Sequence, residues 1–242
     1  MTNKEKIIET IAQRGKITSS EITRDIGVSR QYVNMVISNL IAEKQVIKLG
    51  GTRNAFYVSS EYAQTHPNIL PSIFKKKYRN TSLEEHQVLM ELEEKFPLIS
   101  NISENIKSIF TFAFSEMFNN AIEHSQSKII SIEVSLRNNK LSFIIEDFGV
   151  GVFRNIMKKR RLNSITEAIQ DLLKGKTTTM PKSHSGEGIF FTSKASDLFI
   201  LDSFGYQLII ETLTDEIKIK QISTSKRGTR VIFEIVADSS RH

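Results

Sequence analysis

Three polar residues recur at every fourth position within the stretch FSEMFNNAIEHS (114–125), whose apolar residues repeat at the spacing of a buried helix. Glu116, Asn120 and His124 share one face of a helix, because residues four apart lie one turn above another. The side-chain oxygen of asparagine suits Mg²⁺, a hard cation that keeps several waters and is completed by substrate phosphates. A carboxylate one turn away can hold a metal-bound water or take a proton from an attacking hydroxyl. The row therefore indicates either a ligand-binding face or the ordinary solvated face of an amphipathic helix.

A second set of residues stands where a predicted strand ends. Asp147, Gly149 and Gly151 form the pattern D-x-G-x-G directly after the strand-like run LSFIIED (141–147). The carboxylate offers an acceptor for the amino group of a base, and the glycines allow the backbone to lie against a ring. An ordinary strand-to-helix turn is the alternative explanation.

Glycines also precede two later elements. Gly186 and Gly188 open a predicted helix near 188–196, where free N–H groups and the helix dipole can hold a phosphate. A flexible loop with a helix cap would explain the same pair. Gly228 and Thr229 open the last predicted strand (229–236), and alone they indicate nothing.

The elements that must position these residues lie in 81–242. Two helices are expected first, over 81–96 and about 103–124, and a further helical stretch is expected over roughly 152–174. Period-two patterns predict strands elsewhere. The predicted strands are 129–137, 141–147, 198–204, 206–212, 216–223 and 229–236. Helices followed by a mostly antiparallel sheet predict an α+β domain.

Residues 1–60 predict a separate, smaller domain. Three helices followed by two strands around a GGTRN turn are typical of a winged helix-turn-helix. Residues 61–80, with two prolines and a basic run, are expected to connect the domains. The predicted elements of residues 1–60 are a helix ending at Gly15, helices over 19–27 (capped by Ser19 or Ser20) and 29–45, and strands over 46–50 and 55–59.

The charge of residues 1–60 indicates a nucleic-acid partner. Nine Lys and Arg stand against five Asp and Glu there, which is most of the chain's net charge of +6. Such an excess favours binding to double-stranded DNA, although a winged helix that binds protein is the alternative. Arg, Gln and Asn can read base edges, and Ser and Tyr reach phosphates. The candidate DNA-binding residues are Ser29, Arg30, Gln31, Tyr32 and Asn34 on the third helix, and Arg53, expected in a minor groove.

Composition excludes several classes of protein. The chain has 242 residues and no cysteine, which excludes disulfides, Cys-ligated zinc and thiol catalysis. Its first residues carry no signal-peptide core, and no apolar run is long enough to span a membrane. We therefore expect a cytoplasmic protein without a membrane partner.

The order of the motifs resembles the GHKL (Bergerat-fold) ATP-binding family over residues 81–238. The resemblance rests on E-x-x-x-N-A (116–121), D-x-G-x-G (147–151), G-x-G (186–188) and G-T (228–229). It implies a Bergerat α/β sandwich that binds ATP and Mg²⁺. Asn120 would bind Mg²⁺, and Glu116 would be the general base or would orient a Mg²⁺-bound water. Asp147 would accept the adenine amino group. The other implied nucleotide contacts are Gly149 and Gly151 beside the base, Gly186 and Gly188 at the phosphates, Thr229 at the adenine through its hydroxyl or a water, and His124 further along the row.

Within that family, S-E-x-x-x-N-A-x-x-H (115–124) is most similar to the anti-sigma-factor serine kinases. The H-E-x-x-x-P phospho-acceptor pattern of histidine kinases is missing. The resemblance implies a bacterial transcriptional or signalling regulator that binds DNA through the winged helix and is switched by Mg-ATP. The alternatives are a protein serine/threonine kinase acting on a STAS-like or sigma-factor-like partner, and a slow ATPase. Winged-helix regulators are often dimers, so a homodimer is expected.

Overall fold

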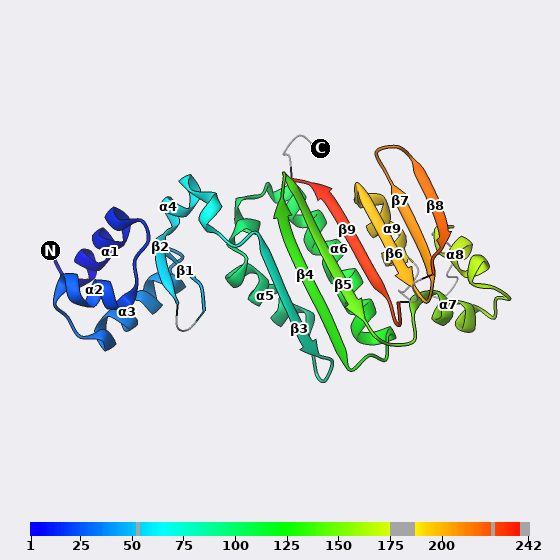
Figure 1. The fold of residues 1–242 in the computed structure, drawn as a ribbon, viewed down its shortest axis with the longest axis horizontal. Helices are drawn as coiled ribbons and strands as arrows, with labels where there is room; N and C mark the ends of the chain where they lie inside the picture. Colours follow the sequence, from blue (N-terminus) through cyan, green and yellow to red (C-terminus); the bar gives the residue numbers. More distant parts are fainter. Residues whose placement is uncertain (52–53, 175–186, 224–225, 238–242) are drawn as a thin grey trace. The chain divides into compact units, whose positions relative to one another are not determined.

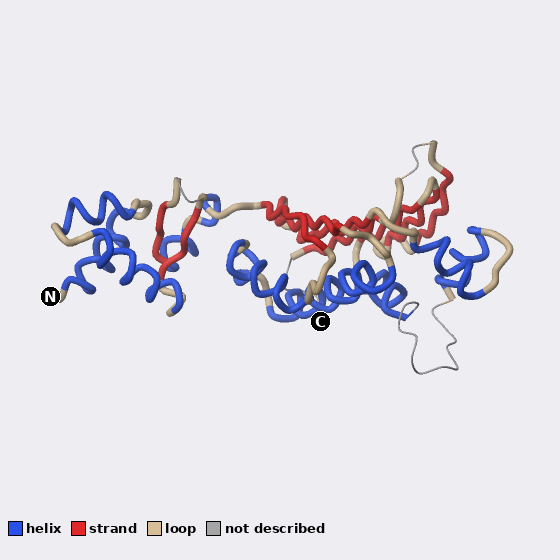
Figure 2. The backbone as a smooth tube through the Cα atoms, turned by 90° about the horizontal axis from the view of Figure 1, so that it is seen from below, coloured by secondary structure: helices blue, strands red, loops and turns tan. Residues whose placement is uncertain are grey.

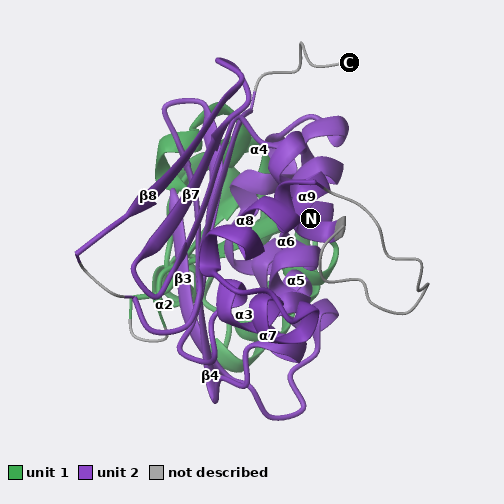
Figure 3. Ribbon diagram, turned by 90° about the vertical axis from the view of Figure 1, so that its right-hand side faces the viewer, with its two compact units in different colours: residues 1–71 green, residues 72–242 purple. Residues whose placement is uncertain are grey.

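The chain is α+β and separates into two compact units. The parts that the computed structural model describes are residues 1–51, 54–174, 187–223 and 226–237 (Figure 1). Contacts between residues divide the chain into unit 1, residues 1–71, and unit 2, residues 72–242 (Figure 3). None of the helices in the described ranges combines the length and the apolar character needed to cross a bilayer.

Unit 1 contains three main helices and a two-stranded hairpin around its own core. Ile7, Ile11, Ile22, Val33 and Leu40 are completely buried and join the helices to one another. Each of these side chains comes from an apolar stripe with helical spacing, which is why the three helices pack together. The elements of unit 1 are α1 (Asn3–Arg14), α2 (Ser19–Ile26), α3 (Arg30–Ala42), β1 (Val46–Leu49), β2 (Phe56–Ser59), α4 (Ser60–Thr65) and η1 (Pro67–Ile69).

The cap of α2 differs from the prediction. Thr18, rather than Ser19 or Ser20, stands at the N-cap. Its hydroxyl accepts a hydrogen bond from the Glu21 N–H at 3.3 Å, and the Glu21 carboxylate accepts one from the Thr18 N–H at 2.7 Å. This reciprocal capping box satisfies two backbone donors. Neither serine could form one, because no glutamate stands three positions after Ser19 or Ser20.

The segment 61–80, predicted to be a connector, instead forms α4, η1 and the strand β3 (Ile73–Arg79). The alternation of buried and exposed residues in IFKKKYR (73–79) is not visible in the sequence, because the charged Lys76 lies on the more buried side of the strand. Its ammonium is neutralised by Glu91 of the first helix of unit 2, at 2.5 Å. Beyond β3, the Asn80 side chain donates to the carbonyl oxygens of Ile122 and Ser127, at 3.1 and 3.0 Å.

Unit 2 is a seven-stranded antiparallel sheet with helices on one face (Figure 2). The strand order is β3-β4-β5-β9-β6-β7-β8, so the last strand of the chain lies in the centre of the sheet (Figure 1). The helices are α5 (Glu85–Lys95), α6 (Glu104–His124), α7 (Val152–Arg160), α8 (Ile165–Leu173) and α9 (Glu187–Ala195), with η2 (Pro97–Asn101) before α6. The strands after β3 are β4 (Ile129–Arg137), β5 (Lys140–Asp147), β6 (Leu198–Ser203), β7 (Tyr206–Glu211), β8 (Glu216–Gln221) and β9 (Arg230–Val236).

Phenylalanines join α6 to the middle of the sheet. Phe110 and Phe114 of α6 each meet Phe143 of β5 edge-on, with ring centroids 5.6 Å apart. Phe143 stacks on Phe233 of β9 at 4.9 Å. These rings are completely buried and carry a large share of the apolar contact between the two layers. They fix the rotation of α6 about its axis, and hence the direction of its polar row.

The helical stretch predicted over roughly 152–174 consists of two helices, α7 and α8. Helix α7 ends at Arg160, and Arg161 adopts the left-handed conformation (φ 54°). A new helix then starts behind Ser164, whose hydroxyl accepts from the Glu167 N–H at 3.1 Å. A left-handed residue at the end of a helix is usually glycine, but here it is arginine. The sequence therefore contained no glycine or proline that would mark this break.

Candidate functional site

A pocket lies between α6, α7, the start of α9 and the strands β5, β6 and β9. Its empty volume is about 600 Å³, open solvent at its mouth included. Most of its wall is apolar, with Met117, Ala121, Ile145, Ile189 and Val231 among its members. An apolar pocket with a few converging polar groups is typical of a small-molecule site.

Five of the residues predicted from the sequence line this pocket together. They come from segments that are far apart in the chain: α6, the end of β5 and the start of β9. These residues are Asn120, His124, Asp147, Gly151 and Thr229. Glu116, Gly149 and Gly188 lie next to lining residues, and Gly186 falls outside the described residues.

Asn120 holds the least satisfied polar group of the pocket. Its amide nitrogen is buried and has no hydrogen-bond partner among the described residues. The neighbouring Asn119 differs, because its amide donates to the Glu85 carboxylate of α5 at 2.9 Å. Buried polar groups are nearly always paired, so an unpaired amide aimed at a pocket indicates a ligand. Rotating the amide by half a turn exchanges its nitrogen and oxygen, so either atom can occupy this position.

Asp147 lines the same pocket from the end of β5. Its side chain is only 4 % exposed, and this burial raises the pKa of its carboxyl group above the usual value. Hydrogen bonds partly oppose the shift, since Oδ1 accepts from the Gly149 N–H at 2.8 Å. A buried carboxylate held by backbone donors is an acceptor of fixed direction for the amino group of a ligand.

The glycines beside Asp147 are required by close approach. A Cβ atom on Gly149 would overlap the carbonyl oxygen of Ser125, and one on Gly228 would lie 2.6 Å from the Asp147 Oδ1. Gly151 and Gly228 also have a φ of +81°, which favours glycine. The D-x-G-x-G pattern therefore lets the turn after β5 approach the end of α6.

Thr229 joins the last strand to the turn after β5. Its hydroxyl accepts a hydrogen bond from the Val152 N–H at 3.0 Å, and its carbonyl accepts from the Asp147 N–H at 2.9 Å. Thr229 therefore fixes both the start of α7 and the backbone that carries Asp147. The resemblance implied that Thr229 would contact the ligand. It did not predict that Thr229 would also hold the backbone of Asp147 and Val152 in place.

Helix α7 supplies lining residues that sequence reasoning missed. Asn155 and Lys159 line the pocket, and neither was among the site residues predicted from the sequence. Burial lowers the pKa of the His124 imidazole, and the nearby Lys159 charge lowers it further. The spacing of Val152, Asn155 and Lys159 on one helical face was the available signal. The Asn120, His124 and Lys159 end of the pocket thus gathers donors and positive charge.

Lys226, in the loop before β9, also contacts the turn that carries Asp147. Its ammonium donates to the Asp147 carbonyl oxygen at 3.0 Å and lies 4.1 Å from the centre of the Phe148 ring. Burial lowers the pKa of this lysine. No sequence pattern indicates this contact, because it joins residues 79 positions apart.

Unit 1 carries a second candidate surface. A groove between α2, α3 and the β1–β2 hairpin is lined by basic and hydroxyl side chains, among them Lys16, Ser20, Arg30, Asn34 and Lys48. Two of the six predicted DNA-binding residues, Arg30 and Asn34, line it.

The other four predicted residues of this surface differ in placement. Ser29 caps α3, since its hydroxyl accepts from the Tyr32 N–H at 3.2 Å, and Tyr32 packs partly against the core of unit 1. Gln31 is exposed beside them, and Arg53 falls outside the described residues.

Comparisons with known proteins supply no family. Neither a protein-family model nor a curated protein matches the chain. The crystal structure of Pseudomonas aeruginosa HmgR aligns with 98 % of this chain and 88 % of its own, at 8 % identity and a TM-score of 0.22. A TM-score at this level supports no conclusion about fold or function.

Proposed function

We propose that unit 2 is a GHKL ATP-binding domain of the Bergerat fold and that it binds Mg-ATP in the pocket beside α6. The observation that carries the proposal is the buried, unpartnered amide of Asn120, which shares an apolar pocket with the buried carboxylate of Asp147. The amino group of adenine would donate to Asp147. The phosphates would lie toward Asn120, His124 and Lys159.

The residues at the Asn120 end suit Mg²⁺. An asparagine oxygen is a hard ligand, and Mg²⁺ in nucleotide sites takes few protein ligands because phosphates and waters complete its shell. No group of three or more His, Asp or Glu side chains that could hold a metal exists within the described residues. The proposal therefore assigns the cation to the nucleotide and to Asn120. The bound ion would neutralise charge on the phosphates.

We propose further that unit 1 is a winged helix-turn-helix that binds double-stranded DNA. The basic groove supports this, because Lys16 from the loop between α1 and α2, Arg30 of α3 and Lys48 of β1 all line it. The whole chain would then be a bacterial, cytoplasmic regulator whose partner or DNA affinity changes with the nucleotide state. Such a switch requires ATP to bind two states of the protein with different affinities.

A second candidate function is phosphoryl transfer to a serine or threonine of a STAS-like or sigma-factor-like protein, or slow hydrolysis of ATP. The position of Glu116 favours it. The carboxylate lies one helical turn from Asn120 and against Gly188 at the start of α9. A general base must stand beside the reacting phosphate, and this place would meet that requirement.

Calorimetric titration of the full chain with ATP, in Mg²⁺ and in EDTA, tests the proposal. We expect ATP to bind with Mg²⁺ and GTP to bind much more weakly, because the guanine carbonyl would face the Asp147 carboxylate. Equal binding of the two nucleotides would remove Asp147 from the base site, and no binding of either would refute the ATP proposal. Incubation with γ-labelled ATP then separates transfer to a protein, release of phosphate and binding without turnover.

A further inference from the structure

The two edge strands of the unit 2 sheet are built differently. At one edge, β3 directs Lys75, Lys77 and Arg79 to the open face, so a second copy of β3 would meet like charges. At the other edge, all six residues of β8 are exposed. Charged side chains on an edge strand are a common protection against pairing with another chain. Edge β3 has this protection in full, whereas β8 alternates charges of both signs with Ile217 and Ile219.

The backbone of β8 has a free hydrogen-bonding edge among the described strands, because β8 is the last strand in the order of the sheet. The N–H of Ile222 donates to the carbonyl oxygen of Gly205 at 2.8 Å, in register with the β7–β8 pairing. Alternate residues of an antiparallel pair direct their N–H and C=O groups to opposite sides. Residues 216, 218 and 220 therefore face β7, and residues 217, 219 and 221 face the free edge.

We propose that β8 is a dimerisation strand that pairs antiparallel with β8 of a second copy of this chain, about a two-fold axis at Lys218. This register places Glu216 opposite the partner's Lys220 and Ile217 opposite the partner's Ile219. Both symmetry-related charge pairs are then complementary, and the edge-facing groups of residues 217 and 219 meet each other. The two sheets would continue into one.

Burial and charge at β8 support this partner. Ile217 and Ile219 are 47 % and 41 % exposed on the same face of the sheet as the buried Leu208 and Ile210 of β7. Pairing would extend that apolar face across the axis. The two copies of Lys218 would meet at the axis, but this ammonium already lies 2.6 Å from Glu216 and 3.3 Å from Glu211. Those carboxylates offset the repulsion.

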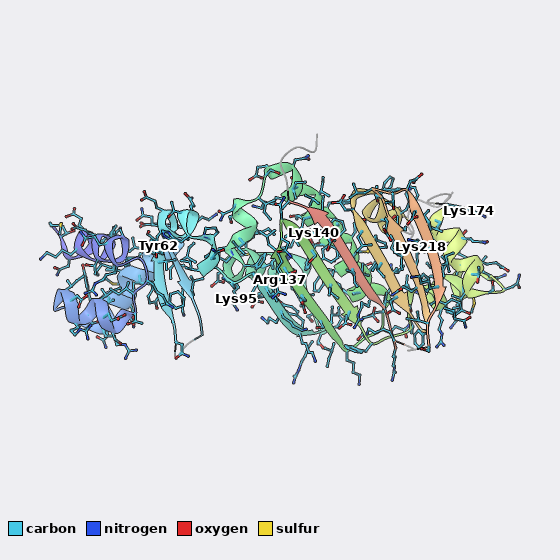
Figure 4. The ribbon with its side chains drawn as sticks, turned by 45° about the horizontal axis from the view of Figure 1, so that its top comes forward. Tyr62, Lys95, Arg137, Lys140, Lys174 and Lys218 are labelled. Atoms are coloured by element: carbon cyan, nitrogen blue, oxygen red, sulfur yellow. The ribbon has the colours of Figure 1, made fainter. Side chains whose placement is uncertain are left out.

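Other registers of β8 are less favourable. A shift by two residues that moves the axis to Ile219 would place Lys218 opposite the partner's Lys220, which are like charges. The opposite shift, with the axis at Ile217, would place Glu216 opposite Lys218 but would place Ile219 and Lys220 opposite Asp215 and Thr214, which lie before the strand begins. A shift by one residue would oppose edge-facing residues to residues whose backbone groups are already used by β7. One short strand pair gives a small interface, so we expect a reversible, concentration-dependent dimer. Lys218 is labelled on the outermost strand in Figure 4.

Charge exchange tests the pairing in the full chain, without nucleotide or DNA. Sedimentation velocity across micromolar to millimolar concentrations should show dimerisation of the wild type. Glu216→Lys alone and Lys220→Glu alone should each weaken it by about tenfold or more, because two attractive pairs become repulsive. An equimolar mixture of the two variants should dimerise again, since each cross-strand pair is then opposite in sign. The mixture also shows that neither variant has merely misfolded. Lys77→Glu on the β3 edge is the control and should leave dimerisation unchanged.

Cross-linking tests the register independently, because the chain has no cysteine of its own. Lys218→Cys should form a disulfide-linked dimer in oxidised glutathione, since Cα atoms at a non-hydrogen-bonded pair are about 4.5 Å apart. Lys220→Cys should not, because its two copies would be separated by four residues, about 13 Å. A wild type that stays monomeric throughout overturns the proposal. The proposal is also overturned if neither charge variant weakens the dimer, or if Lys218→Cys and Lys220→Cys cross-link equally.

Discussion

Gly188, in the first turn of α9, lies directly against the carboxylate of Glu116 on α6. A Cβ atom at position 188 would overlap Oε2 of Glu116, so the two elements touch with no side chain between them. The start of α9 and the predicted catalytic carboxylate are therefore coupled: neither can move toward the other, and displacement of one makes room for the other.

We expect Gly188→Ala to change nucleotide binding or turnover more than stability. The added methyl group meets the end of a flexible glutamate, which can rotate away, and alanine favours a helix by up to about 1 kcal/mol over glycine. Chemical denaturation should show a near-wild-type free energy of unfolding, whereas calorimetry with Mg-ATP or the rate of phosphate release should differ by tenfold or more, about 1.4 kcal/mol.

Gly149→Ala is the matched comparison for that variant. Its methyl group meets the backbone oxygen of Ser125, which cannot rotate away. Overpacking of this kind typically reduces the free energy of unfolding by about 1–3 kcal/mol. If Gly188→Ala is the less stable of the two and binds Mg-ATP normally, Glu116 has no role at the nucleotide.

Asn120→Ala should abolish Mg-ATP binding and leave the apo protein folded. The amide has no partner among the described residues, so its removal breaks no hydrogen bond that the fold uses. Asn119→Ala is the adjacent control, and there the tie to Glu85 is lost at a cost of about 1 kcal/mol. Calorimetry should therefore separate the two asparagines: binding lost in the first and kept in the second. Equal affinities would place the nucleotide elsewhere.

Asp147→Asn should remove ATP binding while stabilising the apo protein at neutral pH. Burial raises the pKa of this carboxyl above its usual 3.8, so the folded state favours the protonated form. The contribution of the protonated Asp147 to the free energy of unfolding is fully present below the unfolded-state pKa, and it is lost as the pH rises through the folded-state pKa. Asparagine carries no charge, so it escapes this loss.

The stability difference between Asp147→Asn and wild type should be greatest near pH 7 and should shrink as the pH falls toward 4. Urea unfolding at a series of pH values measures it. The comparison cancels groups that both proteins share, such as Glu91, whose pKa is about 2 because hydrogen bonds from Lys76, Lys95 and Tyr78 outweigh the effect of burial. A difference that grows in acid would contradict the direction of the Asp147 shift.

Replacing both Arg30 and Lys48 by alanine should weaken DNA binding and flatten its dependence on salt. Each lost phosphate contact lowers the slope of log K against log salt by about 1. Fluorescence anisotropy with a duplex at several salt concentrations measures this slope. Lys6→Ala removes an exposed charge from α1 that does not line the groove, and its slope should match the wild type. An unchanged slope in the double variant would argue for a protein partner of unit 1.

The residues that line the pocket from α6, β5 and β9 were predictable because their spacing survives in the sequence. Asn120 and His124 repeat at helical spacing, and Asp147 ends a strand with clear alternation. The strand β3 was not predictable, because the neutralisation of Lys76 by Glu91 is a tertiary contact. The break between α7 and α8 was missed for a related reason: Arg161 takes a left-handed conformation without the glycine that usually marks one. Lys159 was missed because the sequence does not indicate which of the four basic residues 158–161 lines the pocket.

Strand β3 has a mechanical connection to the pocket of unit 2. It begins at Ile73, and the residue after its other end, Asn80, donates hydrogen bonds to the carbonyl oxygens of Ile122, in the last turn of α6, and of Ser127, just after that helix. Seven extended residues span about 23 Å and are stiff along their length. A displacement of the α6 terminus, where His124 and Ser125 line the pocket, would therefore act on β3 through the two hydrogen bonds of Asn80, so the edge strand of the sheet is coupled to the occupancy of the pocket.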